Sequence, residues 1–142
     1  MFKLTIVTPE EPFYEEDVRS IVLPGSIGYL GVLTDHAPLI TALLPGELRV
    51  VEAEGEKEHL FAITGGFFEV AHNHATVLAD AIEEEDRIDL QRAEQAYERA
   101  RARLAERDRG LDAVRAELAV WRAKNRLQVA RKYHDEQAHA AR

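Results

Sequence analysis

Three of the six histidines, His36, His72 and His74, could take part in acid–base or metal chemistry. His36 follows Asp35 and could act as a general base, but no serine or cysteine stands in a nucleophile-elbow motif. His72 and His74 are two positions apart, so on a strand they could share one face and bind a metal. Two ligands do not complete a zinc site, and neither an H-E-x-x-H motif nor a third ligand stands nearby. Catalysis or metal binding at these histidines is therefore the minor interpretation.

Five arginines could together bind an anion. They are spaced along one side of each of two predicted helices: Arg92, Arg99 and Arg103 in the first, Arg122 and Arg126 in the second. Like charges at this spacing repel by a few tenths of a kcal/mol, and an anion between them would reverse the sign. Counted from a turn at Gly110, Arg99 is level with Arg122, and Arg92 is level with Arg126. The alternative, a solvated arginine face, stays open because the rotation of the second helix is not settled by sequence.

The acidic run Glu83 to Asp86 offers oxygen atoms to a divalent cation. The favoured interpretation is a solvated linker between two modules. Because the run ends where a helix is predicted to begin, its charge also suits the positive end of the helix dipole.

The chain that must position these residues changes character near residue 84. Residues 1–84 carry 4 basic and 15 acidic side chains, whereas residues 85–142 carry 14 basic and 11 acidic ones. All five prolines lie at or before Pro45, and seven of the eight glycines lie at or before Gly66. Turn-forming residues therefore concentrate in the first part, and helix-forming residues in the second. This division predicts a β module followed by a helical module.

The first part alternates apolar and polar residues, as strands with one buried face do. Phe2, Leu4 and Ile6 alternate with polar positions, and further strands are expected over residues 47–50, 57–63, 67–71 and 75–81. About eight or more short strands favour a sandwich or a flattened barrel. Strands and helices do not alternate along the chain, which excludes a Rossmann-like or flavodoxin-like fold.

The second part predicts two helices joined by a short turn. The first is expected from Asp86 or Asp89 to Asp108, with Asp89 as its N-cap, and Gly110 as the stop. The second is expected from Leu111 to Tyr133 or beyond. Its apolar residues form two rows, either of which could face the first helix: Val114, Leu118 and Trp121, or Val120, Ala123, Leu127 and Ala130. Because alanines bury little area, the hairpin is expected to be marginal alone.

Composition limits the function further. The net charge of −8 argues against a nucleic-acid binder, and the absence of cysteine excludes disulfides and thiol catalysis. No uncharged apolar run reaches the length of about 18 residues that a membrane span needs. The first residues do not have the pattern of a signal peptide. We therefore expect a soluble, cytoplasmic chain without direct membrane insertion.

A turn-rich run lies between the first predicted strand and the strand expected over residues 47–50. Its glycines lack the G-x-G-x-x-G spacing and no helix follows, so β-bulges and tight turns are favoured over a phosphate cradle. The run comprises Leu23-Pro24-Gly25, Gly28, Gly31-Val32-Leu33 and His36-Ala37-Pro38-Leu39, and is followed by Pro45-Gly46 and Gly65-Gly66-Phe67. Together with the hairpin at the end of the chain, these residues resemble the epsilon subunit family of the F-type ATP synthase, called delta in mitochondria. The resemblance covers the whole chain; Thr34 stands where many members have proline.

The resemblance implies a ten-stranded β-sandwich over residues 1–85 and an antiparallel two-helix hairpin over residues 86–142. It implies a place in the central stalk, bound to the gamma subunit and seated on the membrane rotor ring, where proton flow is coupled to ATP synthesis. Because the glycines of the turn-rich run permit close backbone approach, docking is expected at Gly28, Gly31, His36 and Pro38. In bacterial members the hairpin also extends along gamma, meets the alpha/beta catalytic head and blocks ATP hydrolysis. No catalytic residue and no required cofactor is implied.

A further motif matches the start of the first helix. Some bacterial members bind ATP through I/L-D-x-x-R-A, which stands here as Ile88-Asp89-Leu90-Gln91-Arg92-Ala93. The resemblance therefore implies a regulatory ATP site made of Glu83, Ile88, Asp89, Arg92, Ala93, Arg99, Arg122 and Arg126. A carboxylate can accept a hydrogen bond from the adenine amino group, and guanidinium groups suit phosphate oxygens. The chain has no Walker A loop, so hydrolysis is not expected.

The resemblance implies a peripheral location on the cytoplasmic face of the bacterial plasma membrane. Two alternatives remain at this point. One is a hydrolase or metal enzyme built on the sandwich, using His36 or the pair His72 and His74. The other is an adaptor outside any ATPase, whose helical hairpin binds an unrelated partner.

Overall fold

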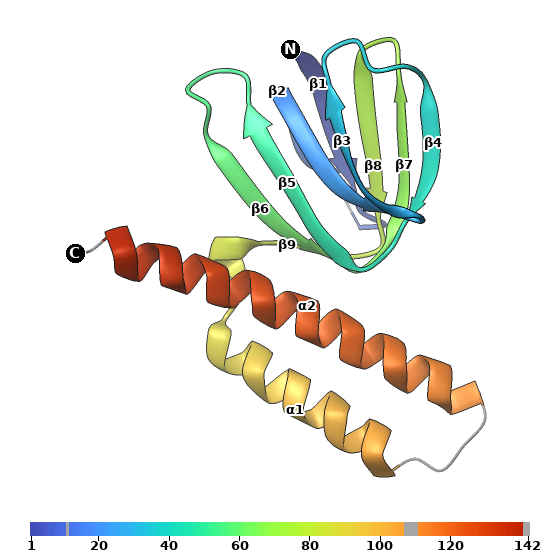
Figure 1. Ribbon diagram of the computed structural model, residues 1–142, viewed down its shortest axis with the longest axis vertical. Helices are drawn as coiled ribbons and strands as arrows, with labels where there is room; N and C mark the ends of the chain where they lie inside the picture. Colours follow the sequence, from blue (N-terminus) through green and yellow to red (C-terminus); the bar gives the residue numbers. More distant parts are fainter. Residues whose placement is uncertain (11, 107–110, 141–142) are drawn as a thin grey trace. The chain divides into compact units, whose positions relative to one another are not determined.

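The computed structural model describes residues 1–10, 12–106 and 111–140 and divides the chain into two units, Met1–Glu84 and Glu85–Arg142 (Figure 1). The first unit is all β and the second is all helical, as the sequence predicts. Neither helix among these residues is long and apolar enough to cross a membrane.

The first unit is a β-sandwich, as expected, with nine strands among its described residues where the resemblance implies ten. The strands are β1 (Phe2–Val7), β2 (Pro12–Gly25), β3 (Gly28–Leu33), β4 (Leu39–Leu43), β5 (Gly46–Glu52), β6 (Glu58–Ile63), β7 (Gly66–Ala71), β8 (His74–Ala79) and β9 (Ile82–Glu84). Their order in the sheet is β1-β8-β7-β4-β2-β5-β6-β9, and β3 pairs with β2. The pair β1–β8 is parallel, and every other pair is antiparallel.

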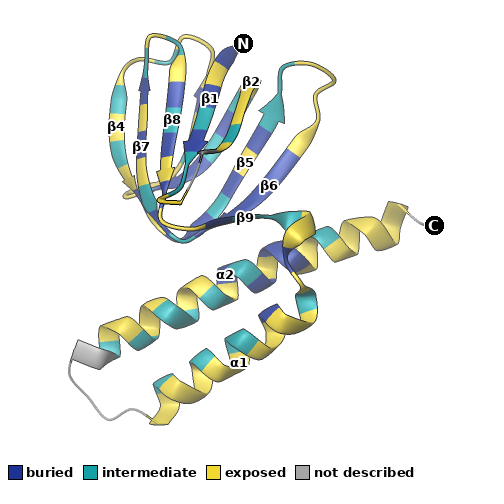
Figure 2. Ribbon diagram, turned by 180° about the vertical axis from the view of Figure 1, so that it is seen from behind, coloured by how far each residue is buried: buried dark blue, intermediate teal, exposed yellow. Residues whose placement is uncertain are grey.

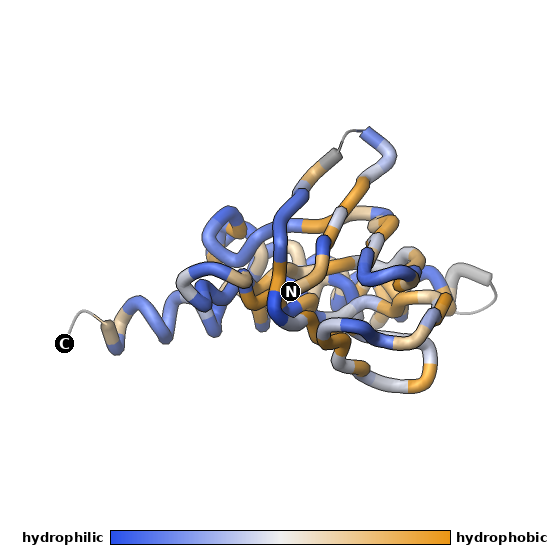
Figure 3. Tube along the Cα trace, turned by 90° about the horizontal axis from the view of Figure 1, so that it is seen from above, coloured by the Kyte–Doolittle hydropathy of each residue, from blue (hydrophilic) through white to orange (hydrophobic). Residues whose placement is uncertain are grey.

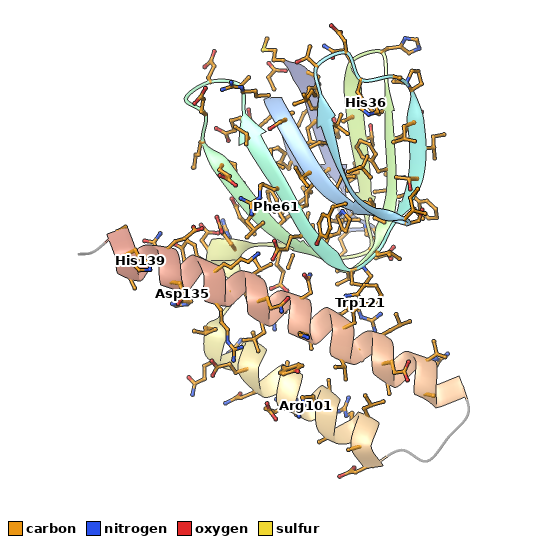
Figure 4. All side chains as sticks on the ribbon, viewed as in Figure 1. His36, Phe61, Arg101, Trp121, Asp135 and His139 are labelled. Carbon is orange, nitrogen blue, oxygen red and sulfur yellow. The ribbon has the colours of Figure 1, made fainter. Side chains whose placement is uncertain are left out.

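The sheet curls upon itself because β1 pairs with both β8 and β2. One face of each strand then points into a common core, which Figure 2 shows as alternating buried and exposed positions. Phe2, Leu4 and Ile6 are all buried, whereas Lys3 between them is exposed. Phe61 of β6, labelled in Figure 4, is fully buried in this core. Its ring lies edge-on to the ring of Tyr14. Burial of side chains this large supplies the main driving force for forming the sandwich.

The short connection between β6 and β7 depends on two glycines. Gly65 and Gly66 have φ angles of 132° and 142°, a region that residues with a side chain rarely adopt. A Cβ atom on Gly66 would lie 2.0 Å from the carbonyl oxygen of Leu78, which belongs to the neighbouring strand β8. Gly66 therefore lets β7 approach the backbone of β8 where β7 begins.

The second unit is an antiparallel pair of helices, α1 (Leu90–Glu106) and α2 (Leu111–Ala140), preceded by a short 3-10 helix η1 (Glu85–Arg87). Asp89 caps α1 as predicted, since its Oδ1 accepts a hydrogen bond of 2.9 Å from the backbone N–H of Arg92. α2 continues seven residues past Tyr133, and its last part is hydrophilic (Figure 3). The expected stop at Gly110 lies outside the described residues.

One expectation about the chain from Glu83 onward is wrong, and one question that the sequence left open is answered. Glu83 and Glu84 are not part of a solvated linker, because they belong to β9 and pair with Ala62 and Phe61 of β6. The apolar row Val114, Leu118 and Trp121 of α2 is exposed, whereas Leu127 and Ala130 of the other row are buried. The exposed row is the one that α2 leaves available to a partner.

The glycines provide a direct test of this fold. Gly66→Ala should lower the free energy of unfolding by at least about 2 kcal/mol, because it forces both a clash and an unfavourable φ. The melting temperature should fall accordingly. Gly31→Ala is the matched control, since its Cβ would meet no atom within 4 Å and should change stability by less than about 0.5 kcal/mol. Calorimetric unfolding of the full-length variants measures both. Equal melting temperatures for the two variants would contradict the packing described for Gly66.

Candidate functional site

The outer surface of the sandwich carries an apolar row that runs across four strands. The register pairs Val7 with Leu78, Leu78 with Phe67, and Phe67 with Ala42, so these side chains stand next to one another on β1, β8, β7 and β4. Phe67 is 59% exposed and Leu78 is 52% exposed, and Ile40, two positions from Ala42 on β4 and paired with Glu69, is 73% exposed. We call these five residues the outer apolar row. A contiguous exposed apolar surface on a folded domain is typical of a protein-binding site.

Sequence reasoning missed the outer apolar row. The signal was present, because Phe67 and Phe68 are adjacent on one strand, as are Val77 and Leu78. Adjacent residues of a strand point to opposite faces, so one aromatic or aliphatic side chain of each pair must face outward. Phe68 and Val77 are the buried members of the two pairs.

The four predicted docking residues lie on or next to β3. Gly28 has a φ of 133° at the turn from β2, and Gly31 lies within β3. A Cβ at either glycine would meet nothing within 4 Å, so both leave open space beside the backbone. His36 and Pro38 follow in the connection to β4, at one end of the sandwich (Figure 4). The ring Nδ1 of His36 donates to the carbonyl of Ala37 at 2.6 Å, so the loop itself orients the imidazole.

Asn73, in the turn between β7 and β8, holds the connection between β3 and β4 in place through its side chain. Its side-chain oxygen accepts a hydrogen bond of 2.9 Å from the backbone N–H of Asp35. Its side-chain nitrogen donates to the carbonyl of Met1 at 2.8 Å. One turn residue between β7 and β8 thereby joins the predicted docking loop to the start of β1. No sequence pattern pointed to Asn73.

The histidine pair does not share a strand face, so this part of the metal hypothesis is wrong. His72 and Asn73 have φ angles of 50° and 59° and form the turn between β7 and β8, whereas His74 begins β8. Nε2 of His74 lies 3.0 Å from the hydroxyl of Thr5. Within residues 1–10, 12–106 and 111–140, no group of three or more histidine, aspartate or glutamate side chains could hold a metal ion.

A buried polar cluster joins three strands of the sandwich. His59 is 8% exposed, and its two ring nitrogens each lie 2.7 Å from a carboxylate, that of Glu84 in β9 and that of Glu52 in β5. Both contacts can be donations from the ring only when each nitrogen carries a proton. Burial raises the pKa of the nearby Tyr14 hydroxyl far above its ordinary value, and the charges of Glu52, Glu16 and Glu84 add to the effect. The cluster fixes β9, the strand that leads into the helical unit.

The start of α1 lines a cavity of about 400 Å³ within the helical unit. Its lining is Ile88, Asp89, Leu90, Gln91, Glu94 and, from α2, His134. The first four positions of the predicted ATP motif thus reach a common space, together with two residues that the sequence did not suggest. Asp89 serves both as the helix cap and as part of this cavity.

The predicted phosphate-binding arginines do not all gather at this cavity. Arg99 lines a second cavity, of about 410 Å³, with Arg103 of α1 and Arg115 of α2. Arg92, Arg122 and Arg126 are outside the lining of both cavities, Ala93 is buried, and Glu83 lies in β9 of the other unit. The helices meet through alanines at the second cavity, namely Ala96, Ala100, Ala116, Ala119 and Ala123. The sequence left open which side of α2 faces α1, and these alanines decide it.

Comparison with known proteins agrees with the two-unit architecture. Residues 1–85 match the β-sandwich domain of the ATP synthase delta/epsilon chain, and residues 86–131 match the long α-helix domain of the same chain. The chain belongs to the ATP synthase delta/epsilon chain family. Membership makes it a structural, non-catalytic subunit of ATP synthase, in agreement with the resemblance drawn from the sequence.

Curated relatives match nearly the whole length. The ATP synthase epsilon chain of Desulforamulus reducens is 44% identical over 128 residues, which cover 90% of this chain and 96% of the relative. The epsilon chain of Moorella thermoacetica is 45% identical over 127 residues, covering 89% and 94%.

Two solved assemblies contain similar chains. In the Euglena gracilis mitochondrial ATP synthase (OSCP/F1/c-ring), the similar chain has a TM-score of 0.75 and 28% identity, over 86% of this chain and 76% of that one. A chain in the central stalk/c-ring structure of the Tetrahymena thermophila mitochondrial ATP synthase shares the fold, with a TM-score of 0.59, 16% identity, and coverage of 92% and 94%.

Proposed function

We propose that this epsilon-family chain is a rotor subunit of a bacterial F-type ATP synthase, docked through its sandwich on the gamma subunit and the membrane rotor ring. The observation that carries the docking proposal is the outer apolar row. It exposes the large apolar side chains of Phe67, Leu78 and Ile40, and it continues across four strands that fix its shape. The open backbone at Gly28 and Gly31 adds a second surface on which a partner chain can approach closely.

The helical unit is the regulatory part in this proposal. Its helices meet largely through alanines, which bury little apolar area and hold the hairpin weakly. α2 also presents the exposed apolar row Val114, Leu118 and Trp121. An extended hairpin would offer this row to gamma, and its net charge of +3 would favour acidic surfaces of the alpha/beta catalytic head. In that position the helices would restrain ATP hydrolysis.

ATP is proposed as a regulatory ligand of the closed hairpin. The cavity at Asp89 supplies carboxylates from Asp89 and Glu94 for the adenine amino group, and Leu90 supplies an apolar wall. The motif arginine Arg92 follows within the first turn of α1. A ligand bound by residues of both helices exists only in the closed state, so its binding energy shifts the balance toward that state.

The subunit would be peripheral, on the cytoplasmic face of the plasma membrane, and would couple proton transport to ATP synthesis only as part of the complex. Partner dependence separates this proposal from its rivals. A hydrolase built on the sandwich would act alone, and an adaptor would bind a protein other than gamma.

The first test concerns docking. Phe67→Ser combined with Leu78→Ser should weaken binding to the gamma subunit at least tenfold, since truncating central apolar anchors costs more than about 1 kcal/mol each. Glu69→Ser is the matched control, because Glu69 is exposed on β7 two residues from Phe67 and should be nearly neutral. Calorimetric titration with purified gamma subunit measures the affinity of each variant. Docking is contradicted if the double variant binds like the control while both remain folded.

The second test concerns restraint of hydrolysis. A subunit lacking residues 87–142 should still fold and bind gamma, because the sandwich has its own core over residues 1–84. ATP synthase reassembled with it should synthesise ATP but hydrolyse it faster than the complex with the full-length subunit. Unchanged hydrolysis would remove the inhibitory role, whereas failure of the truncated sandwich to fold would place the unit boundary elsewhere.

The third test concerns ATP. Millimolar ATP should raise the melting temperature of the isolated full-length chain more than AMP does, and Arg92→Ala or Arg126→Ala should abolish most of this increase. At a concentration 100-fold above Kd, a ligand of the folded state adds about 2.7 kcal/mol. Melting curves with calorimetric titration measure the effect. If the ATP-dependent increase in melting temperature survives both substitutions, or if there is no increase, the motif forms the start of α1 and does not bind ATP.

A further inference from the structure

The buried imidazole of His59 joins three strands of the sandwich through its two ring nitrogens. His59 lies on β6 and is 8% exposed. Its Nδ1 lies 2.7 Å from Oε1 of Glu84 on β9, and its Nε2 lies 2.7 Å from Oε1 of Glu52 on β5. We propose that these three residues form a proton-dependent clamp on β9, in which the doubly protonated imidazole holds β9 against β6 and loss of one ring proton loosens it.

A neutral imidazole cannot donate to both carboxylates. It has one N–H donor, and its other ring nitrogen is an acceptor. An acceptor nitrogen 2.7 Å from an ionised carboxylate is repelled, because neither group has a proton to share, and the repulsion is strong where water is largely excluded. The side chains of Glu52 and Glu84 are 27% and 30% exposed, so solvent is within reach of either one. Loss of one proton therefore breaks one of the two contacts and leaves the other in place.

The contact to β9 is the weaker of the two attachments. β5 is held to β6 by backbone pairing over Gly46–Val51, whereas β9 pairs with β6 over Ile82–Glu84 alone. β9 is the last strand in the order of the sheet, with β6 as its neighbour. Opening a three-residue strand at the end of a sheet costs less free energy than separating two long central strands. Proton loss is therefore expected to release β9 and to leave β5 paired.

Acidic groups face the imidazole from three strands. Besides Glu52 of β5 and Glu84 of β9, these are Glu16 and the phenol of Tyr14 on β2, whose ring centroid lies 6.0 Å from that of His59. Burial and the three carboxylates raise the pKa of the Tyr14 hydroxyl far above its ordinary value, so this group stays uncharged near neutral pH. The tyrosine therefore does not contribute a charge change of its own.

The nearby basic side chains are directed elsewhere. Arg49 of β5 is exposed between two buried residues of its strand and pairs with Glu58. Lys57, which precedes β6, is exposed. Histidine is the residue type whose ordinary pKa places its charge change between about pH 5 and 8. The clamp is thus expected to be closed at the acidic end of this range and open at the alkaline end.

The position of β9 in the chain gives the clamp a consequence beyond the sandwich. β9 ends at Glu84, and η1 and α1 follow directly. In the proposed function, release of β9 would lengthen the free connection that precedes the helical hairpin. The clamp itself is a property of residues 1–84 and does not depend on the proposed rotor role.

The experiment follows two quantities on the full-length chain between about pH 5.5 and 8.5. An NMR titration of the His59 ring reports when it loses a proton. Hydrogen exchange, corrected for the intrinsic pH dependence of amide exchange, reports the protection of the β9 amides. That protection should fall at least about fivefold as the ring loses its proton, as expected for loss of one charge-assisted hydrogen bond at a partly exposed carboxylate. Amides of β1 should keep their protection, because β1 lies outside the clamp.

Two substitutions isolate the clamp. His59→Gln should remove the pH dependence of β9 protection, since the glutamine amide has the same donor and acceptor at every pH. Glu84→Gln should remove it as well, because the carboxamide can donate to the neutral ring or accept from the protonated one. His74→Gln is the matched control, since His74 is an exposed histidine at the start of β8, and it should retain the full pH dependence. Circular dichroism confirms that each variant keeps its strands.

Three results would overturn the proposal. The first is loss of the His59 ring proton without a change in β9 protection, or a ring that keeps one protonation state across the whole range. The second is pH-dependent loss of protection that persists in both His59→Gln and Glu84→Gln. The third is an equal loss in β1 and β9, which would mean that pH acts on the whole sandwich. None of these measurements involves gamma or ATP, so they stand or fall separately from the proposed function.

Discussion

The sandwich depends on the hydrogen bonding of one long strand. β2 runs for 14 residues and pairs with β1, β3, β4 and β5 along its length. Because it changes partners, it closes the sheet on one side through β1 and extends it on the other through β5. The predicted docking residues follow β2 along the chain, on β3 and in its connection to β4, and the outer apolar row lies on other strands of the same closed sheet. Closure also leaves fewer free strand edges, which limits unspecific pairing with other chains.

In the proposed function the chain acts by binding partner proteins, which is consistent with membership of a family of structural ATP synthase subunits. The sandwich presents an apolar face over β1, β8, β7 and β4, and the hairpin presents arginines around an alanine contact. These features belong to two units of opposite charge, net −11 and net +3. A sandwich fold alone is compatible with many functions, so the function has to be argued from these surfaces.

The sequence predicted those features that local chemistry determines. Alternation located most strands, and Asp89 was correctly placed as the cap of α1 because its side chain acts on neighbouring amides. Long-range pairing was not accessible. The outward direction of Phe67 and Leu78 is set by the sheet register. His72 lies in the turn between β7 and β8 with a left-handed backbone conformation, and not on a strand with His74. The side of α2 that meets α1 followed from alanines, which hydrophobic periodicity weights too little.

The alanine contact between α1 and α2 also sets how often the helices come apart in solution. Alanine contributes little buried area, so separating the helices costs much less free energy than opening a sheet whose core holds Phe61 and Phe68. Backbone amides of α1 then exchange with solvent through partial openings, while those of the central strands wait for global unfolding. The protein is therefore expected to have two levels of stability within one chain, and the lower level belongs to the helical unit.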